Sequence, residues 1–137
     1  MSTVARKKTA TKQTRKKMKN AGEPKPMKES ILEHLRLTLA HDPSIATSRD
    51  WWTCISLAVR DRMVTNMIET QATHFKTRTR RVYYLSLEYL MGRMLVNNMH
   101  NAGLYDESRA AIEALGLDWD EIVEEELDMG LGNGGLG

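Results

Sequence analysis

The sequence predicts a mainly α-helical chain with one buried β-strand, the incomplete start of an α/β domain. Apolar residues recur at helical spacing over much of residues 29–128. Residues 82–87 read Val-Tyr-Tyr-Leu-Ser-Leu, which is typical of a strand buried on both faces of a parallel sheet. The last eight residues contain five glycines and therefore favour a loop over a helix. A lone parallel strand, and a glycine loop with no helix after it, are both expected in one part of a longer protein.

Local signals place the expected helices and their ends. A first helix is expected over residues 29–40, because Pro43 follows it and the residue before a proline disfavours helical backbone. Thr47, with Asp50 three residues later, has the pattern of a capping box, so a second helix is expected to start there and to run for about seven turns to Phe75. The remaining helices are expected at residues 94–101, 106–115 and 118–128.

Two interpretations concern burial. Trp51 and Trp52 are interpreted as core anchors of the long helix, whereas its charged residues are expected on solvent-facing sides; these are Arg49, Arg60, Asp61 and Arg62. Residues 106–128 contain ten acidic residues and one arginine, and this run is interpreted as a solvated face.

Charge is distributed unevenly along the chain. Residues 1–28 carry ten Lys or Arg against one acid, Glu23, whereas residues 29–137 carry ten basic and seventeen acidic residues. Like charge with low hydrophobicity predicts a disordered basic tail over residues 1–28 and leaves residues 29–137 as the folded part. The tail is interpreted as a solvated segment, the alternatives being an arm that binds nucleic acid or another polyanion and a segment regulated by threonine phosphorylation. No aromatic residue is interleaved for base stacking, so nucleic acid is not the expected partner.

The composition argues against a disulfide-bonded, membrane-spanning or secreted protein. Cys54 is the only cysteine, so no intrachain disulfide can form and a reducing compartment is expected. No apolar run approaches the roughly 20 residues that span a bilayer, and the basic N-terminus lacks the apolar segment of a secretory signal. The predicted location is the cytoplasm, and no metal site is predicted.

Two features indicate a binding site. Successive backbone N–H groups in the glycine-rich run of residues 130–137 can form a concave nest for an anion such as phosphate. The run also fits the spacing G-x-G-x-x-G, but the acidic helical pattern before it does not fit the strand that a dinucleotide-binding fingerprint requires. Glu88 lies at the carboxyl end of the predicted strand, where ligands bind in open α/β sheets. It is either a site residue or a member of a structural ion pair.

Two long motifs, in the order and spacing of that family, and a third, earlier segment closely resemble the glycogen (α-glucan) phosphorylase family. Residues 81–93 read Arg-Val-Tyr-Tyr-Leu-Ser-Leu-Glu-Tyr-Leu-Met-Gly-Arg, and residues 130–137 read Gly-Leu-Gly-Asn-Gly-Gly-Leu-Gly. Residues 46–52 read Ala-Thr-Ser-Arg-Asp-Trp-Trp and are followed by Val-Arg-Asp at residues 59–61. The resemblance covers roughly residues 29–137 and leaves the basic tail outside.

The resemblance implies a large homodimeric enzyme of two α/β domains, with a GT-B-like glycosyltransferase fold and pyridoxal phosphate buried between the domains. Such enzymes cleave terminal α-1,4 bonds of a glucan with inorganic phosphate and release glucose 1-phosphate. By resemblance, the backbone N–H groups of Gly134 and Gly135 contact the substrate phosphate, and Asn133 and Leu136 border the same pocket. Glu88 is implied to lie beside the cofactor phosphate, paired with a basic residue from later in the chain.

The resemblance also implies a nucleotide effector site along the long helix. Asp42 and Gln71 match its pattern. Phe75 stands where a tyrosine stacks on the effector and lacks its hydroxyl, and Met67 and Ala72 replace a tryptophan and a glutamine, so an unregulated enzyme is expected. The lysine that binds the cofactor, and the residues that contact the glucan, belong to sequence beyond Gly137. The chain alone is therefore expected to be inactive.

Overall fold

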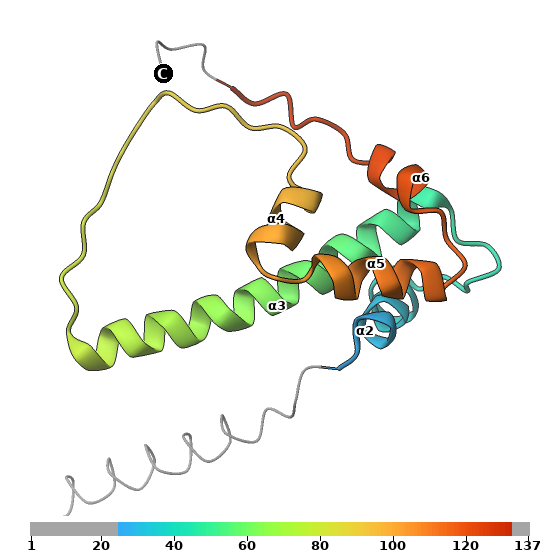
Figure 1. Ribbon diagram of the computed structural model, residues 1–137, viewed down its shortest axis with the longest axis horizontal. Coiled ribbons are helices and arrows are strands. Elements are labelled where there is room, and N and C mark those ends of the chain that lie inside the picture. The colour runs from blue at the N-terminus through green and yellow to red at the C-terminus, as the bar shows by residue number, and fades with distance from the viewer. Residues whose placement is uncertain (1–24, 133–137) are drawn as a thin grey trace, which may run out of the picture.

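The computed structural model describes residues 25–132, and Figure 1 shows a cluster of helices from which one long helix projects. The elements, in chain order, are α2 (Met27–Glu33), η1 (His34–Thr38), α3 (Ser48–Thr77), α4 (Leu95–Asn101), α5 (Tyr105–Ala114) and α6 (Trp119–Glu124). η1 is a π-helical turn that continues α2, so the two together form the helix expected over residues 29–40. None of the helices in residues 25–132 has both the length and the apolar composition needed to cross a membrane.

The core lies around the first half of α3. The buried residues of this helix recur at helical spacing and are Trp51, Cys54, Ile55, Ala58 and Val59. Helices α2, α4 and α6 pack against α3, and α5 packs against α2, α4 and α6. The buried side chains that these elements contribute are Met27, Ile31, Leu35, Leu95, Met99, Ala111, Ile112 and Ile122.

The predicted start of α3 is confirmed in detail. The Asp50 N–H donates to Thr47 Oγ1 at 3.2 Å, and the Thr47 N–H donates to the Asp50 carboxylate at 3.0 Å. The two residues therefore form a reciprocal capping box. These hydrogen bonds from Thr47 hold the pKa of Asp50 below its ordinary value. Trp51 is buried and Trp52 partly buried, in agreement with their interpretation as core anchors.

The second half of α3 projects from the cluster, as Figure 1 shows. Met67, Ile68 and Phe75 continue the apolar stripe of the sequence, yet they are 51%, 48% and 83% exposed. The periodic pattern therefore predicts the helix correctly, but no described element covers this part of the stripe.

The predicted buried strand at residues 82–87 is wrong for the described structure. Residues 79–94 run as an extended segment from the end of α3 back to α4, and Val82 and Leu85 are 95% and 93% exposed. Within residues 25–132 the only β-type pairing is an isolated bridge between Leu90 and Gly132. A buried strand needs a neighbouring strand in the same sheet, and within residues 25–132 the backbone forms no sheet that residues 82–87 could join.

The last expected helix, over residues 118–128, is shorter in the structure. α6 starts at the Asp118 cap, whose carboxylate accepts the Glu121 N–H at 2.9 Å, and it ends at Glu124. Its acidic continuation leaves the helix and runs beside residues 90–95, with consequences for the site described below.

Two isoleucines on α3 provide a matched test of this packing. We expect Ile55→Ala to lower the free energy of unfolding by about 2–5 kcal/mol, because Ile55 is 0% exposed and its removal leaves a cavity. Ile68→Ala, on the projecting half of the same helix, is expected to change it by less than about 1 kcal/mol. Urea unfolding followed by circular dichroism measures both values, and equal losses would contradict the asymmetry of the core.

The thiol of Cys54 is expected to be unreactive in the folded chain. The side chain is fully buried, and burial raises the pKa of the thiol to about 11. Near pH 8 only about one thiol in a thousand is then ionised, whereas an exposed cysteine with a pKa of about 8.5 is ionised in about a quarter of molecules. Ellman's reagent is expected to label Cys54 only after denaturation; rapid labelling of the native chain would contradict its burial.

Candidate functional site

Two segments far apart in the sequence meet where the chain returns from α6. Leu90 and Gly132 form an antiparallel bridge, and the Met91 N–H donates to the Leu131 carbonyl at 3.2 Å. We call residues 88–95 and 124–132 the paired segments; Figure 1 shows them running side by side. They contain the end of the motif at residues 81–93 and the start of the glycine-rich motif at residues 130–137, so the structure brings these two motifs together.

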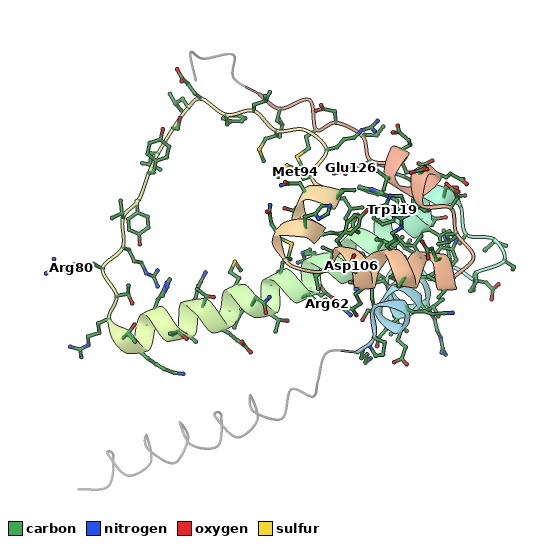
Figure 2. The ribbon with its side chains drawn as sticks, viewed as in Figure 1. Arg62, Arg80, Met94, Asp106, Trp119 and Glu126 are labelled. Atoms are coloured by element: carbon green, nitrogen blue, oxygen red, sulfur yellow. The ribbon has the colours of Figure 1, made fainter. Side chains whose placement is uncertain are left out.

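Glu126 joins the paired segments from a buried position. It is 6% exposed, and its carboxylate accepts the Met94 N–H at 2.6 Å and the Leu95 N–H at 3.0 Å. Figure 2 shows Met94 and Glu126 close together near the start of α4. These amides belong to the first turn of α4, where no intrahelical carbonyl is available to them. Glu126 therefore caps α4 from a position 31 residues away in the sequence.

Sequence reasoning missed Glu126, because it read the whole acidic run of residues 106–128 as a solvated face. Most of that run is exposed, as expected, but Glu126 is buried. In the sequence, the only signal is that Glu126 is the last of three glutamates and is followed by Leu127. This position does not tell whether the Glu126 side chain is buried or exposed.

An exposed ion pair between Arg93 and Glu124 lies beside the Glu126 contact. Arg93 Nη1 lies 3.0 Å from Glu124 Oε2, and the two side chains are 46% and 72% exposed. An ion pair as exposed as this one typically contributes about 0–1 kcal/mol. Within the described residues, Glu126 is thus the stronger side-chain link between the paired segments.

The glycine-rich segment begins with a turn that uses one of its amides. Gly130 has φ +61°, and its N–H donates to the Asp128 carboxylate at 2.8 Å. Gly132 passes close to the other segment, since a Cβ atom there would lie 3.5 Å from Leu90 Cδ1. The Gly130 N–H is already engaged, so an anion would have to bind amides further along the loop.

The predicted phosphate-site residues are placed only in part. Asn133, Gly134, Gly135 and Leu136 lie outside the described residues. Glu88 is exposed and lies two residues before the bridge at Leu90. Its N–H donates to Ser86 Oγ at 3.0 Å, and Ser86 Oγ–H donates to the Glu88 carbonyl at 3.0 Å. The structure therefore places Glu88 on the segment that pairs with the start of the glycine loop.

The three predicted effector residues do not come together in one chain. Asp42 lies in the loop before α3, where its carboxylate accepts the Ser44 hydroxyl and N–H, which lowers the pKa of Asp42. Gln71 lies near the other end of α3, about 35 Å from Ser48 at 1.5 Å per residue. Gln71 lines a surface cavity of about 480 Å³ with Arg80 and Arg81, whereas Phe75 is 83% exposed and does not line it. Figure 2 shows Arg80 on the chain just beyond the end of α3.

Another cavity, of about 400 Å³, lies between α2, η1 and α3. In it His34 Nε2 lies 3.1 Å from Asp61 Oδ2, and Arg62 donates to the Lys25 carbonyl at 2.7 Å and to Glu107 at 3.3 Å. The Arg62 side chain is only 12% exposed, so the expectation that it faces solvent is wrong. Its hydrogen bonds tie the start of α2 to α3 and α5. Within residues 25–132 no group of three or more His, Cys, Asp or Glu side chains is arranged to hold a metal ion.

Comparison with known proteins relates the chain to one class of enzyme. No family model matches it. Over 116 residues it is 45% identical to "Glycogen phosphorylase, brain form" of Bos taurus, which covers 85% of this chain and 14% of that protein. Over 111 residues it is 48% identical to the liver form of Homo sapiens and 42% identical to the glycogen phosphorylase of Chlamydia pneumoniae, each match covering 81% of this chain. The predicted resemblance to the glycogen phosphorylase family is therefore confirmed, and the chain spans about 14% of the length of these relatives.

Two glycines provide a matched test of the pairing. Gly130→Ala places a Cβ on left-handed backbone at a cost of about 1–2 kcal/mol, so we expect the Met91 amide to exchange with solvent about 5–30 times faster. Gly132→Ala is expected to change that rate less than about threefold, because its Cβ would make an ordinary contact with Leu90. Hydrogen exchange followed by nuclear magnetic resonance measures both rates. A larger effect from Gly132→Ala would contradict the described geometry.

Proposed function

We propose that the chain is the N-terminal part of an α-glucan phosphorylase, a glycosyltransferase that uses inorganic phosphate to release glucose 1-phosphate from the ends of α-1,4-glucans. One observation carries the proposal: the bridge between Leu90 and Gly132 joins the two motifs through which the sequence resembles glycogen phosphorylases. The chain would contribute one wall of the phosphate site, and the rest of the protein would contribute the other.

The chemistry of this wall follows from its backbone. The Gly130 N–H is taken by Asp128, so the amides of Gly134 and Gly135 would be the donors to the substrate phosphate, with Asn133 and Leu136 at the edge of the pocket. Donors that are already oriented toward developing charge stabilise a transition state without reorganisation. Glu88 would hold and orient a cationic side chain from the remainder of the protein.

The described residues fit part of a pyridoxal phosphate site. A carboxylate at Glu88 and a glycine loop suit the neighbourhood of a phosphate group and its cationic partners. The lysines of residues 25–132 do not suit covalent attachment at this site: Lys25 pairs with Glu33, Lys28 donates to the Ala114 carbonyl, and Lys76 lies near the far end of α3. When bound, the cofactor would supply a phosphate group for proton transfer. Its anchoring lysine would come from sequence that follows this chain, so the chain alone would be inactive.

The arrangement of α3 supports a homodimer. Asp42 and Gln71 lie toward opposite ends of this helix, so a site that contains both would take Asp42 from a second copy of the chain. We place the vestigial effector site at the cavity lined by Gln71, Arg80 and Arg81, whose cationic side chains suit an anionic ligand. Phe75 would lie at its rim. A cytoplasmic enzyme is proposed because Cys54 is the only cysteine and no intrachain disulfide can form, which suits a reducing compartment.

The complete protein that contains this chain tests the proposal directly. With glycogen, phosphate and pyridoxal phosphate it is expected to release glucose 1-phosphate, whereas the 137-residue chain is expected to release none. Glu88→Gln in the complete protein is expected to lower kcat about 10- to 100-fold, since it removes the charge that orients a cationic partner. The matched control is Glu29→Gln, an exposed residue of α2, which is expected to leave kcat unchanged.

Two results would overturn the proposal. One is a complete protein that binds the cofactor but forms no glucose 1-phosphate. The other is equal effects of Glu88→Gln and Glu29→Gln, which would remove Glu88 from the site. Deletion of residues 1–24 from the complete protein tests whether the basic tail is needed, and release of glucose 1-phosphate is expected to continue without it.

A further inference from the structure

We infer that Glu126 is a positioning residue of the phosphate site: it fixes the alignment of the Glu88 segment against the glycine-rich segment. This inference rests on the proposed function and deepens it. The described residues hold the two segments together through the Glu126 carboxylate, the Arg93–Glu124 ion pair, and the contacts of Leu90 and Met91 with Gly132 and Leu131. Of these, the Glu126 contact is the buried, charged one.

The geometry of the carboxylate makes it selective for one alignment. Oε1 accepts the Met94 N–H at 2.6 Å and lies 3.1 Å from the Leu95 N, while Oε2 lies 3.0 Å from the Leu95 N. Both amides point out of the first turn of α4, where no other backbone carbonyl can accept them. Because Glu126 is 6% exposed, water is a poor substitute, and moving the carboxylate by one residue would leave buried charge and buried amides unmatched.

The consequence for the site follows from chain geometry. Extended backbone advances about 3.3 Å per residue and turns successive side chains to opposite sides. A slip of one residue between the paired segments would therefore displace Gly130 and Gly132 by about 3.3 Å relative to Glu88. Displacements of about 1 Å are enough to slow catalysis about 100-fold. Glu126 lies four residues before Gly130, and Met94 lies six residues after Glu88. The contact between Glu126 and Met94 therefore constrains the Glu88 segment and the glycine-rich segment together.

A capping role for α4 alone is the competing explanation, and the Met91 amide distinguishes the two. Met91 donates to Leu131 and not to Glu126. If Glu126 only stabilises α4, its loss exposes the Met94 and Leu95 amides and leaves the Met91 amide protected. If it aligns the paired segments, the Met91 amide loses protection as well.

The experiment uses the 137-residue chain with Glu126→Gln, which keeps the shape of the side chain, and Glu126→Ala, which removes the contact. We expect amide exchange at Met94, Leu95 and also Met91 to become at least about tenfold faster in Glu126→Ala, with a smaller increase in Glu126→Gln. Glu125→Gln is the matched control, a neighbouring carboxylate outside these contacts, and is expected to leave all three rates unchanged. Unaltered Met91 exchange in a folded variant overturns the inference. Should Glu126→Ala fail to fold, Glu126→Gln decides by the same criterion.

A second readout links the alignment to the reaction. In the complete protein, Glu126→Gln is expected to raise the KM for inorganic phosphate about tenfold and to change the KM for glycogen less than about threefold. A loss of stability alone would lower the amount of active enzyme without separating the two KM values. If the unsubstituted complete protein shows no phosphorolysis, the proposed function fails, while the Met91 exchange still decides whether Glu126 aligns the segments.

Discussion

Burial of the first half of α3 is the interaction on which the other described elements depend. Helices α2, α4 and α6 each pack against it, and its side chains at Cys54, Ile55 and Ala58 are 0% exposed. Burying Ile55 contributes about 1.5–3 kcal/mol, and the buried side chains of the other helices belong to the same core cluster as this stretch. Arg62 extends the same arrangement, because its partly buried guanidinium donates to the Lys25 carbonyl and to Glu107 and so connects α3 with α2 and α5.

Beyond this buried half, the chain is fixed at few points. The extended segment of residues 79–94 is attached to α3 at one end and to the paired segments at the other, and its side chains between Val82 and Leu90 are largely exposed. Such a segment takes its position from its ends and not from its own packing. The position of Glu88 therefore depends on the contacts of Glu126, Met91 and Leu90 at the nearer end of the segment, together with the hydrogen bonds that its backbone exchanges with Ser86.

The sequence predicts features that depend on residues close together in the chain, and it fails for features that depend on residues far apart. The helices, the capping box of Thr47 and the buried tryptophan at Trp51 were predictable, because each depends on neighbours within a few residues. The prediction of a strand at residues 82–87 is wrong, because its composition suits a strand but the described residues form no sheet around it. Glu126 and Arg62 were missed for a related reason: burial of a charged residue depends on partners 31 to 45 residues away, as their contacts with Leu95 and Glu107 show. The resemblance to glycogen phosphorylases was predictable because it rests on contiguous motifs, whereas the meeting of those motifs in space was not.

The sign of the charges in the proposed site sets a further requirement. Backbone amides attract a phosphate, but a carboxylate repels it; two like unit charges about 5 Å apart repel by about 3 kcal/mol at an effective dielectric constant of 20. Glu88 on the segment that pairs with the glycine loop would thus weaken phosphate binding unless a cation lies between the two groups. The arginine of the paired segments, Arg93, is directed to Glu124 at 3.0 Å, so it is not available for that purpose. The family resemblance implies that this cation comes from the remainder of the protein, and Glu88 would then serve to hold it in place beside the phosphate.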